Sequence, residues 1–352
     1  MQTFIYDRKK LNENYSFIKG YGNVYYTLKA NSSKQVLNFI KENISEGDGF
    51  CISSKADFYT LENLQTEVNK ICCINVLLDF EDLIYLYKKG VRKFVFDDYQ
   101  LLQRFSQNVE IEDCEIIIRL NISEIFSRKI SHLGTNTTEM VNMFSLIESC
   151  KRAGISLYFQ KNIKLAKNYV KKGCKFIRNM IAKYDFIKVI NIGGINEDVD
   201  FKYLLELKNP DVCLNIETGT RILKDVMELH THLLNTKEIG GKNIIVIKNG
   251  IFSGFFDVIY YKKKFSIAIC IKKEIDLLKH RKRKYKKLFI YGGSGDSGDF
   301  LGKYYIDKNI DVKKIKEIIV KDIAGYFGVF FMKYGTDIEL GRAIYKEKNY
   351  EI

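Results

Sequence analysis

The chain has 352 residues, 46% of them hydrophobic and 28% charged, with a formal net charge of +14 at pH 7. This composition excludes an intrinsically disordered chain. A membrane-spanning helix requires a run of about 18 apolar residues, and the sequence has none. The first residues lack the apolar core of a signal peptide, and the eight cysteines include no C-x-x-C pair. We therefore expect reduced thiols, a cytoplasmic location and no metal site.

Much of the positive charge lies in two short runs, YKKKF at residues 261–265 and KHRKRKYKK at residues 279–287. No nucleic-acid-binding motif accompanies them, so solvated basic loops are the simplest interpretation and a nucleic-acid partner is not expected. The alternative is an acidic partner, or an anionic substrate attracted by the positive field.

Between residues 20 and about 220, short buried strands alternate with amphipathic helices. The strands are expected at residues 25–29, 49–54, 70–77, 93–98, 115–122, 155–160, 186–194 and 212–219. Helical patterns at residues 32–44, 54–68 and 81–90 separate several of them. Repeated units of a strand followed by a helix predict a parallel sheet, and eight such units close a barrel.

Beyond about residue 235 the pattern changes to strands at residues 242–252, 264–273 and 286–293, which indicate mainly antiparallel pairing. We therefore predict an α/β protein with a (β/α)8 TIM-like barrel at residues 20–235. A C-terminal, mainly antiparallel β-domain follows at residues 236–352, and residues 1–19 are assigned to it.

Several predicted strands end on unusual residues, and in a parallel barrel the carboxyl ends of strands carry the functional side chains. Lys29 and Glu217 end the first and the last strand, Arg119 lies near the end of the fifth, and Gly193 and Gly194 end the seventh. Singly, each has a simple explanation, such as a solvated lysine, a turn, or an ion pair between Arg119 and Glu217. Together they supply a lysine that can form a Schiff base, a phosphate loop and a carboxylate for a pyridine nitrogen.

This set, in this order, resembles the fold-type III pyridoxal-phosphate decarboxylases, the ornithine, arginine and diaminopimelate decarboxylase family with an alanine racemase-like barrel. YYTLKANSS resembles the family's Y-A-x-K-A-N, and FIYGGSGDSGDFLG is similar to its G-P-x-C-x-S-G-D. Weaker matches, in the correct order, are GFCISSKADF, IIIRLNI, FSRKISHLGTN, INIGGIN, IETGTRIL and DIAGYFGVFF. The resemblance spans residues 20–335 and implies pyridoxal 5'-phosphate as the cofactor.

The resemblance also implies roles for the matched residues. Lys29 would bind the cofactor's aldehyde and later carry a proton, and Glu217 would keep the pyridine nitrogen protonated. Asp296 would approach the substrate across the interface of a homodimer with shared active sites. The other residues implied at the cofactor are Arg119, His132, Tyr158, Gly193, Gly194, Gly219, Thr220 or Arg221, and Tyr326.

The departures from the family pattern bear on the reaction and on the substrate. Gly295 replaces the cysteine that protonates the substrate carbon, so another group would have to deliver that proton. Tyr158 replaces the histidine that stacks on the ring. The aspartate that binds a distal amine aligns near Tyr261, among cations, which favours a carboxylate, a phosphate or a carrier-linked group. Further replacements in the matched motifs are Cys51, Gln160, Lys161 and Ile195.

The leading hypothesis is pyridoxal-phosphate-dependent decarboxylation, by a carboxy-lyase, of an amino acid or an amino-acid-derived intermediate in a specialised biosynthetic pathway. The intermediate could be linked to a carrier protein or to a nucleotide. Two alternatives stay open: a racemase or other carbanion chemistry on the same scaffold, and a degenerate paralogue that binds or regulates a partner.

His230 and His232 have a spacing that would suit a metal site on a strand. No cysteine or carboxylate partner is evident in the sequence, so we expect both on the surface of a helix.

Overall fold

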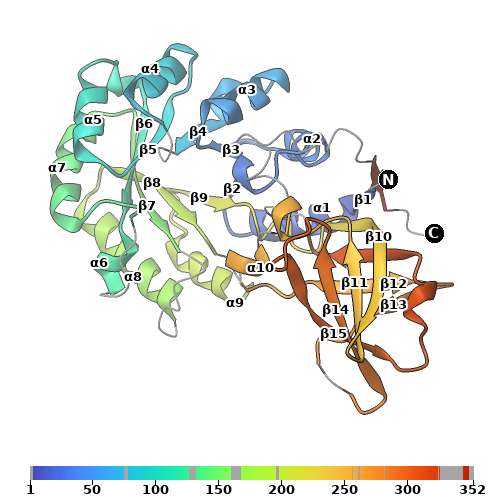
Figure 1. Ribbon diagram of the computed structural model, residues 1–352. Helices are drawn as coiled ribbons and strands as arrows, with labels where there is room; N and C mark the ends of the chain where they lie inside the picture. Colours follow the sequence, from blue (N-terminus) through green and yellow to red (C-terminus); the bar gives the residue numbers. More distant parts are fainter. Residues whose placement is uncertain are drawn as a thin grey trace. The chain divides into compact units, whose positions relative to one another are not determined.

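The computed structural model describes residues 3–74, 78–126, 132–159, 168–195, 198–255, 257–260, 262–280, 282–323, 325 and 344–348. The chain divides into two compact units, Asn14–Ile222 and a second unit that combines Met1–Glu13 with Leu223–Ile352. Figure 1 shows the first unit as strands surrounded by helices and the second as mainly strands.

Within the described residues, parallel strands close a barrel in the order β2 to β9, each strand pairing with the next and β9 pairing with β2. The strands are β2 (Asn23–Thr27), β3 (Gly49–Ile52), β4 (Ile71–Ile74), β5 (Lys93–Phe96), β6 (Glu115–Leu120), β7 (Arg152–Tyr158), β8 (Ile187–Gly193) and β9 (Cys213–Thr218). The predicted barrel with an additional mainly antiparallel sheet is confirmed.

Helices connect the strands and cover the outside of the barrel (Figure 1). They are α1 (Arg8–Lys19), α2 (Lys34–Asn43), α3 (Lys55–Asn63), α4 (Phe80–Lys88), α5 (Tyr99–Ser106), α6 (Ile122–Phe126), α7 (Thr137–Ile147), α8 (Tyr169–Lys183) and α9 (Asp198–Phe201). Short polar side chains fix several starts: Asp79, Asp98 and Asn136 each accept a hydrogen bond from a backbone amide in the first turn. On α2, Val36, Leu37, Phe39 and Ile40 form the buried face.

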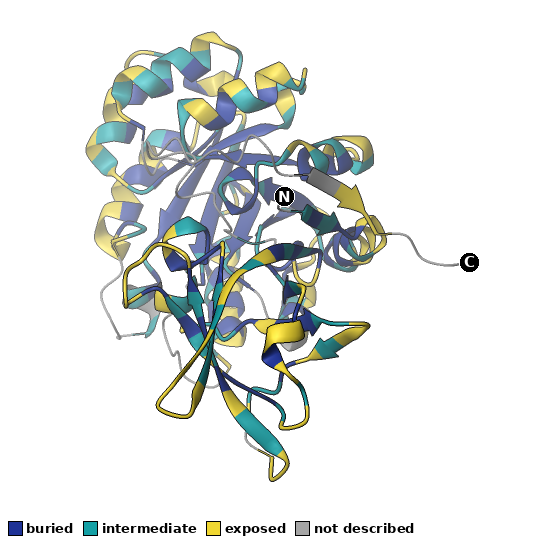
Figure 2. Ribbon diagram, turned by 45° about the vertical axis from the view of Figure 1, so that its right-hand side comes forward, coloured by how far each residue is buried: buried dark blue, intermediate teal, exposed yellow. Residues whose placement is uncertain are grey.

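The barrel interior is a packed core and not a channel. Side chains that alternate along the strands form an apolar cluster of Tyr25, Cys51, Cys72, Ile74, Val95, Ile117 and Val189. Figure 2 shows the barrel strands almost entirely in the colour of buried residues. Polar groups near the carboxyl ends of the strands therefore lie directly above closely packed apolar side chains.

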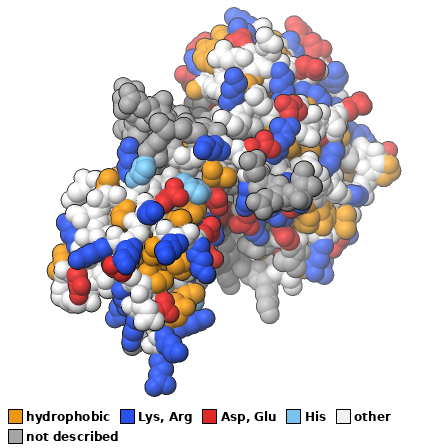
Figure 3. All heavy atoms as spheres, turned by 90° about the vertical axis from the view of Figure 1, so that its right-hand side faces the viewer, with side chains coloured by type: hydrophobic (Ala, Val, Ile, Leu, Met, Phe, Trp, Pro, Cys, Tyr) orange, Lys and Arg blue, Asp and Glu red, His pale blue; other side chains and the backbone are white. Residues whose placement is uncertain are grey.

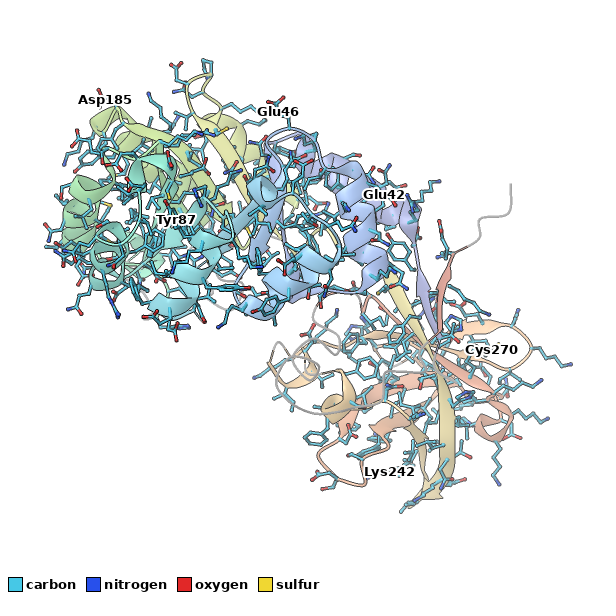
Figure 4. All side chains as sticks on the ribbon, turned by 90° about the horizontal axis from the view of Figure 1, so that it is seen from above. Glu42, Glu46, Tyr87, Asp185, Lys242 and Cys270 are labelled. Carbon is cyan, nitrogen blue, oxygen red and sulfur yellow. The ribbon has the colours of Figure 1, made fainter. Side chains whose placement is uncertain are left out.

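The second unit is a curled sheet in the order β13-β12-β16-β10-β11-β14-β15, with β1 pairing with β10 and β17. Its strands are β1 (Thr3–Tyr6), β10 (Met227–Ile239), β11 (Lys242–Ile247), β12 (Ser266–Cys270), β13 (Glu274–Asp276), β14 (Tyr285–Gly292), β15 (Phe300–Asp307), β16 (Glu317–Lys321) and β17 (Ile344–Glu347). A short helix, α10 (Asp257–Tyr260), lies between β11 and β12. The β10–β11 hairpin extends to Lys242, at the far end of this unit from Cys270 (Figure 4).

The expectation that His230 and His232 lie on a helix is wrong, because both lie on strand β10. His230 contacts two carboxylates, Glu228 at 3.2 Å and Glu317 at 3.1 Å. No group of three or more metal-ligating side chains suited to an ion occurs in the described part of the chain.

All eight cysteines lie among the described residues and are free thiols. No helix within the described ranges combines the length and the apolar character needed to cross a lipid bilayer.

Candidate active site

The turn after β2 carries Lys29 into the carboxyl end of the barrel. Leu28, Lys29 and Ala30 form one turn of 3-10 helix, in which Leu28 and Ala30 are fully buried. The Lys29 Nζ atom lies 5.8 Å from the centre of the Tyr158 ring. Burial lowers the pKa of Lys29, the nearby Glu217 carboxylate opposes that shift, and the Arg119 guanidinium adds to it.

No hydrogen bond or ion pair joins the Lys29 amine to any residue that the structure describes. A buried amine with a lowered pKa is more often neutral, and a neutral amine is the form that attacks a carbonyl carbon. The amine is therefore available for covalent chemistry.

Glu217, at the end of β9, is buried, with 7% of its surface exposed. Asn191 of β8 donates a hydrogen bond from its side-chain amide to Glu217 Oε1, and a second one to Ser156 Oγ of β7, at 3.3 Å. Sequence reasoning missed Asn191 and Ser156. The signal was present in the strand INIGG, where a polar residue interrupts an apolar run two positions before the glycines.

Arg119 of β6 is 3% exposed, and its Nε atom has no hydrogen-bond partner among the described residues. The sequence analysis offered an ion pair between Arg119 and Glu217 as a simple reason for two charged residues at these strand ends. That ion pair is not formed in the described part of the chain. An unused guanidinium donor in a buried position is costly unless a ligand accepts from it.

Gly193 and Gly194 form a turn that no other residue fits. Gly194 has φ of +79°, and a side chain there would place Cβ 2.0 Å from the carbonyl oxygen of Phe159. A Cβ on Gly193 would lie 2.6 Å from the Tyr158 ring and 3.0 Å from Glu217 Oε2. The lack of side chains at these two positions lets the turn approach Phe159, Tyr158 and Glu217 more closely than any other residue would allow.

The turn after β9 packs against the lysine turn, because a Cβ on Gly219 would lie 2.6 Å from the Cβ of Ala30. Thr220 is half-buried. Arg221 is buried, and its guanidinium is already bonded to Asp198 at 2.7 Å and to Asn14 at 3.0 Å. These two bonds hold Arg221 in place, so its part is to fix the turn. Of Thr220 and Arg221, Thr220 is therefore the better candidate for contact with a ligand.

The remaining predicted residues lie apart from this cluster or outside the described residues. His132 is exposed. Tyr326 lies outside the described residues, as do Gln160, Lys161 and Tyr261.

Asp296 lies in the second unit, on an exposed loop between β14 and β15, where its Oδ1 atom accepts a hydrogen bond from Gly298 at 2.6 Å. Gly295 has φ of +81° and no atom within 4 Å of the position of a Cβ. The buried Asp299, which the sequence analysis did not single out, anchors this loop by accepting a hydrogen bond from the backbone amide of Ile251 at 2.6 Å.

A hollow with a volume of about 520 Å³ opens at the other end of the strands, beside Asn23, Lys208 and Cys213. It lies at the amino-terminal face, which in barrels of this kind contributes to stability and not to catalysis.

Comparison with known proteins identifies the family resemblance independently of these contacts. Residues 7–144 match the family described as "Pyridoxal-dependent decarboxylase, pyridoxal binding domain". The resemblance to the fold-type III decarboxylases is confirmed. The predicted pyridoxal phosphate cofactor and the predicted carboxy-lyase class are confirmed at the level of this family.

Two relatives within the decarboxylases illustrate how distant the similarity is. The chain is 19% identical over 273 residues to a lysine/ornithine decarboxylase of Selenomonas ruminantium, covering 71% of this chain and 69% of that protein. It is 23% identical over 264 residues to the 2-[(L-alanin-3-ylcarbamoyl)methyl]-2-hydroxybutanedioate decarboxylase of Staphylococcus aureus (strain NCTC 8325 / PS 47), covering 64% of each. The matched part is thus just under two thirds of that second relative's length.

Solved structures of decarboxylases share the fold over nearly the whole chain. Lysine decarboxylase from Selenomonas ruminantium superposes with a TM-score of 0.80 at 17% identity, covering 100% of this chain and 93% of that one. The arginine decarboxylase of Paramecium bursaria Chlorella virus gives a TM-score of 0.78 at 15% identity, covering 99% and 95%. At these identities the similarity establishes the fold alone.

The residues present fit pyridoxal phosphate. Among the described residues, Lys29 offers an amine with no ion pair, Arg119 an Nε donor with no partner, Glu217 a carboxylate, and Gly193 and Gly194 a turn without side chains. These groups come from the ends of β2, β6, β8 and β9, the place where barrel enzymes carry their chemistry.

Proposed function

We propose that this chain is a pyridoxal-phosphate-dependent decarboxylase of an amino acid or an amino-acid-derived acid, acting in a specialised biosynthetic pathway. The observation that carries the proposal is the amine of the half-buried Lys29, whose pKa is lowered by loss of contact with water and which lies near Tyr158, Glu217 and Arg119. Within the range proposed for the cofactor-binding domain, residues 20–235, the barrel unit ends at Ile222 and strand β10 belongs to the second unit. The eight free thiols agree with a cytoplasmic location.

Each residue of the cluster has a part in this reaction. Lys29 would attach the cofactor through its aldehyde and, when the substrate's amine replaces it, would return as a base that moves a proton. Glu217 would hold a proton on the ring nitrogen, and Tyr158 would lie against the ring. When bound, pyridoxal phosphate supplies a ring that withdraws the electron pair left by departing CO₂.

The cofactor's phosphate would be held by backbone amides at Gly193 and Gly194 and by the turn of Gly219 and Thr220, with Arg221 fixing that turn. Tyr326 and His132 are proposed on the family resemblance alone. Arg119 would direct its unused Nε donor to the cofactor or to the substrate.

A homodimer would complete the site, with Asp296 of one chain reaching the substrate of the other. The exposure of Asp296 and the empty space around Gly295 among the described residues support this arrangement, because the Asp296 side chain bonds within the described part of the chain only to Gly298 of its own loop.

The proposed substrate carries an acidic or carrier-linked distal group in place of a free amine. One named relative acts on lysine and ornithine, and the other on a hydroxybutanedioate, which is rich in carboxylates. The net charge of +14 favours the second type, and lysine and arginine side chains are prominent on the face shown in Figure 3.

The test is an absorbance spectrum of the purified protein with added pyridoxal phosphate. We expect a visible band in the wild type that is absent in Lys29→Ala and retained in Lys34→Ala, which removes an exposed lysine five residues away. CO₂ release is then measured with lysine, ornithine and amino acids that bear a distal carboxylate. A wild type with no band would refute the proposal.

The loss of the acid at Gly295 favours one alternative, a racemase or other carbanion chemistry at the same lysine. A visible band with loss of optical activity, and without CO₂ release from any acid tested, would identify it.

A further inference from the structure

Asn191 lies in the polar layer at the carboxyl end of the barrel. Its register places it between Ser156 on β7 and Asn215 on β9, and 2% of its surface is exposed. Two positions earlier on the same strand, Val189 belongs to the apolar cluster of the interior. The strand thus changes from apolar to polar one layer below the glycine turn.

A buried amide in this place is costly unless its donors are used. Both N–H groups of Asn191 are used, one by Glu217 Oε1 and the other by Ser156 Oγ at 3.3 Å. The amide nitrogen must face Glu217, because a carboxylate oxygen accepts hydrogen bonds and does not donate them. The contact therefore joins a donor to a charged acceptor, the stronger kind of hydrogen bond.

The two oxygens of Glu217 are left in different environments. Oε1 is bonded to Asn191, whereas Oε2 accepts no hydrogen bond from any described residue and lies on the side of Gly193. A Cβ on Gly193 would lie 3.0 Å from Oε2 and 2.6 Å from the Tyr158 ring, so the glycine is what lets both groups approach this turn closely. One oxygen is fixed by Asn191, and the other accepts no hydrogen bond among the described residues.

We infer that Asn191 is a positioning residue that fixes Glu217 through Oε1, so that Oε2 is held ready for a protonated ring nitrogen. This inference rests on the proposed function. An amide that donates to the carboxylate favours its charged form, and a charged Glu217 keeps the proton on the ring nitrogen. That arrangement serves carbanion chemistry, which decarboxylation requires.

The first test compares Asn191→Leu with Asn215→Leu. Asn215 is an equally buried amide on the neighbouring strand, but it bonds to Asn23 at 3.1 Å and not to Glu217. We expect Asn191→Leu to keep the Lys29-dependent visible band but to change the pH dependence of its wavelength, and to lower kcat by about tenfold to a hundredfold. We expect Asn215→Leu to leave the wavelength and its pH dependence unchanged. Equal changes in the two variants, or no change in Asn191→Leu, would overturn the inference.

A second test uses the protein without cofactor, so that it stands apart from the proposed function. Asn191→Leu, Glu217→Met and the double variant form a thermodynamic cycle in urea unfolding. We expect the two substitutions to be non-additive by at least about twofold in the unfolding equilibrium constant. Additive effects would overturn the inference even if the wild type binds pyridoxal phosphate. If the effects are non-additive but the wild type shows no visible band, the proposed function is refuted, whereas the coupling between Asn191 and Glu217 stands.

If Asn191→Leu does not fold, the nearly isosteric Asn191→Asp replaces it in both tests. The aspartate removes both donors, so the same changes in spectrum and kcat are expected. An Asn191→Asp variant with the wild-type spectrum and kcat would overturn the inference.

Discussion

The carboxyl end of the barrel and the loop that carries Asp296 hold their polar groups in opposite ways. In the barrel, Glu217 and Arg119 are 7% and 3% exposed, and Glu217 is held by Asn191 from the neighbouring strand, 26 positions away in the sequence. In the loop, Asp296 is exposed and bonds to its own neighbours, Ser294 and Gly298.

The difference separates two parts of the proposed enzyme. The proposed cofactor end draws its groups from the strands of one barrel, and the family resemblance implies its lysine and glutamate at Lys29 and Glu217. In the loop, proposed to act at the substrate end, the resemblance implies that Gly295 replaces a cysteine, so another group would have to supply that acid. Substitutions in the barrel are therefore expected to affect the cofactor, and substitutions in the loop to affect only the substrate.

Glu217→Gln is the substitution expected to have the largest effect. It keeps the shape but removes the charge that would hold the ring nitrogen protonated, so CO₂ release is expected to fall by about a hundredfold to a thousandfold. Cofactor binding, measured by the visible band, is expected to persist. Normal turnover in this variant would contradict the assignment of the carboxyl end of the barrel to the cofactor.

Asp296→Asn is expected to act on the substrate alone. Turnover should fall by about tenfold to a hundredfold, because one charged contact is lost, while the visible band and cofactor affinity stay at the wild-type level. Mixing this variant with Lys29→Ala should restore part of the activity if each site takes its aspartate from the other chain. A loss of the visible band in Asp296→Asn would contradict the separation.

Cys51→Asp tests the electrostatics beneath Lys29. Cys51 is fully buried near Glu217 and Arg119, at a position where the family resemblance implies an acid. A carboxylate there would favour the charged amine and raise the pKa of Lys29, opposing the effect of burial. The rate of cofactor attachment should then reach its plateau at a pH about one unit higher than in the wild type. Cys51→Asn, which adds no charge, is the control and should leave the profile in place.

His230→Gln is expected to have the smallest effect, and only on the second unit. Hydrogen bonds that the His230 ring donates to the carboxylates of Glu228 and Glu317 raise the pKa of His230 above its usual value, against the opposing effect of burial. The charged ring therefore stabilises the folded state below about pH 6.5, and this contribution is lost as the pH rises through the raised pKa. In urea unfolding, the variant should be less stable than the wild type at pH 5.5 by less than about 1 kcal/mol, with no difference at pH 9. Turnover should be unchanged.

The barrel strands could be predicted from the sequence, because each strand is an apolar run that ends at glycine or a polar residue. The prediction failed at MELHTHLL, where apolar and polar residues alternate with the period of two that marks a half-buried strand. The two histidines at i and i+2 therefore lie on the same face of strand β10.

The site was predictable only where a residue belongs to a local motif. Lys29 and Glu217 end strands, so they could be placed. The partners of Arg221 could not be predicted, because Asp198 and Asn14 are 23 and 207 positions away, and only the closed barrel brings them together. The same holds for Asn191, whose contact with Glu217 spans 26 positions and two strands.

The close approach of Gly219 to Ala30 joins the last strand of the barrel to the first, so the surroundings of Lys29 are complete only when both strands are present. Strand β2 pairs with β9, and the hydrogen bond between Asn23 and Asn215 joins positions 192 residues apart. Until that last strand has been synthesised, the ring of strands cannot close. A chain truncated before Cys213 is therefore expected to leave Lys29 exposed to water, without the burial that lowers its pKa.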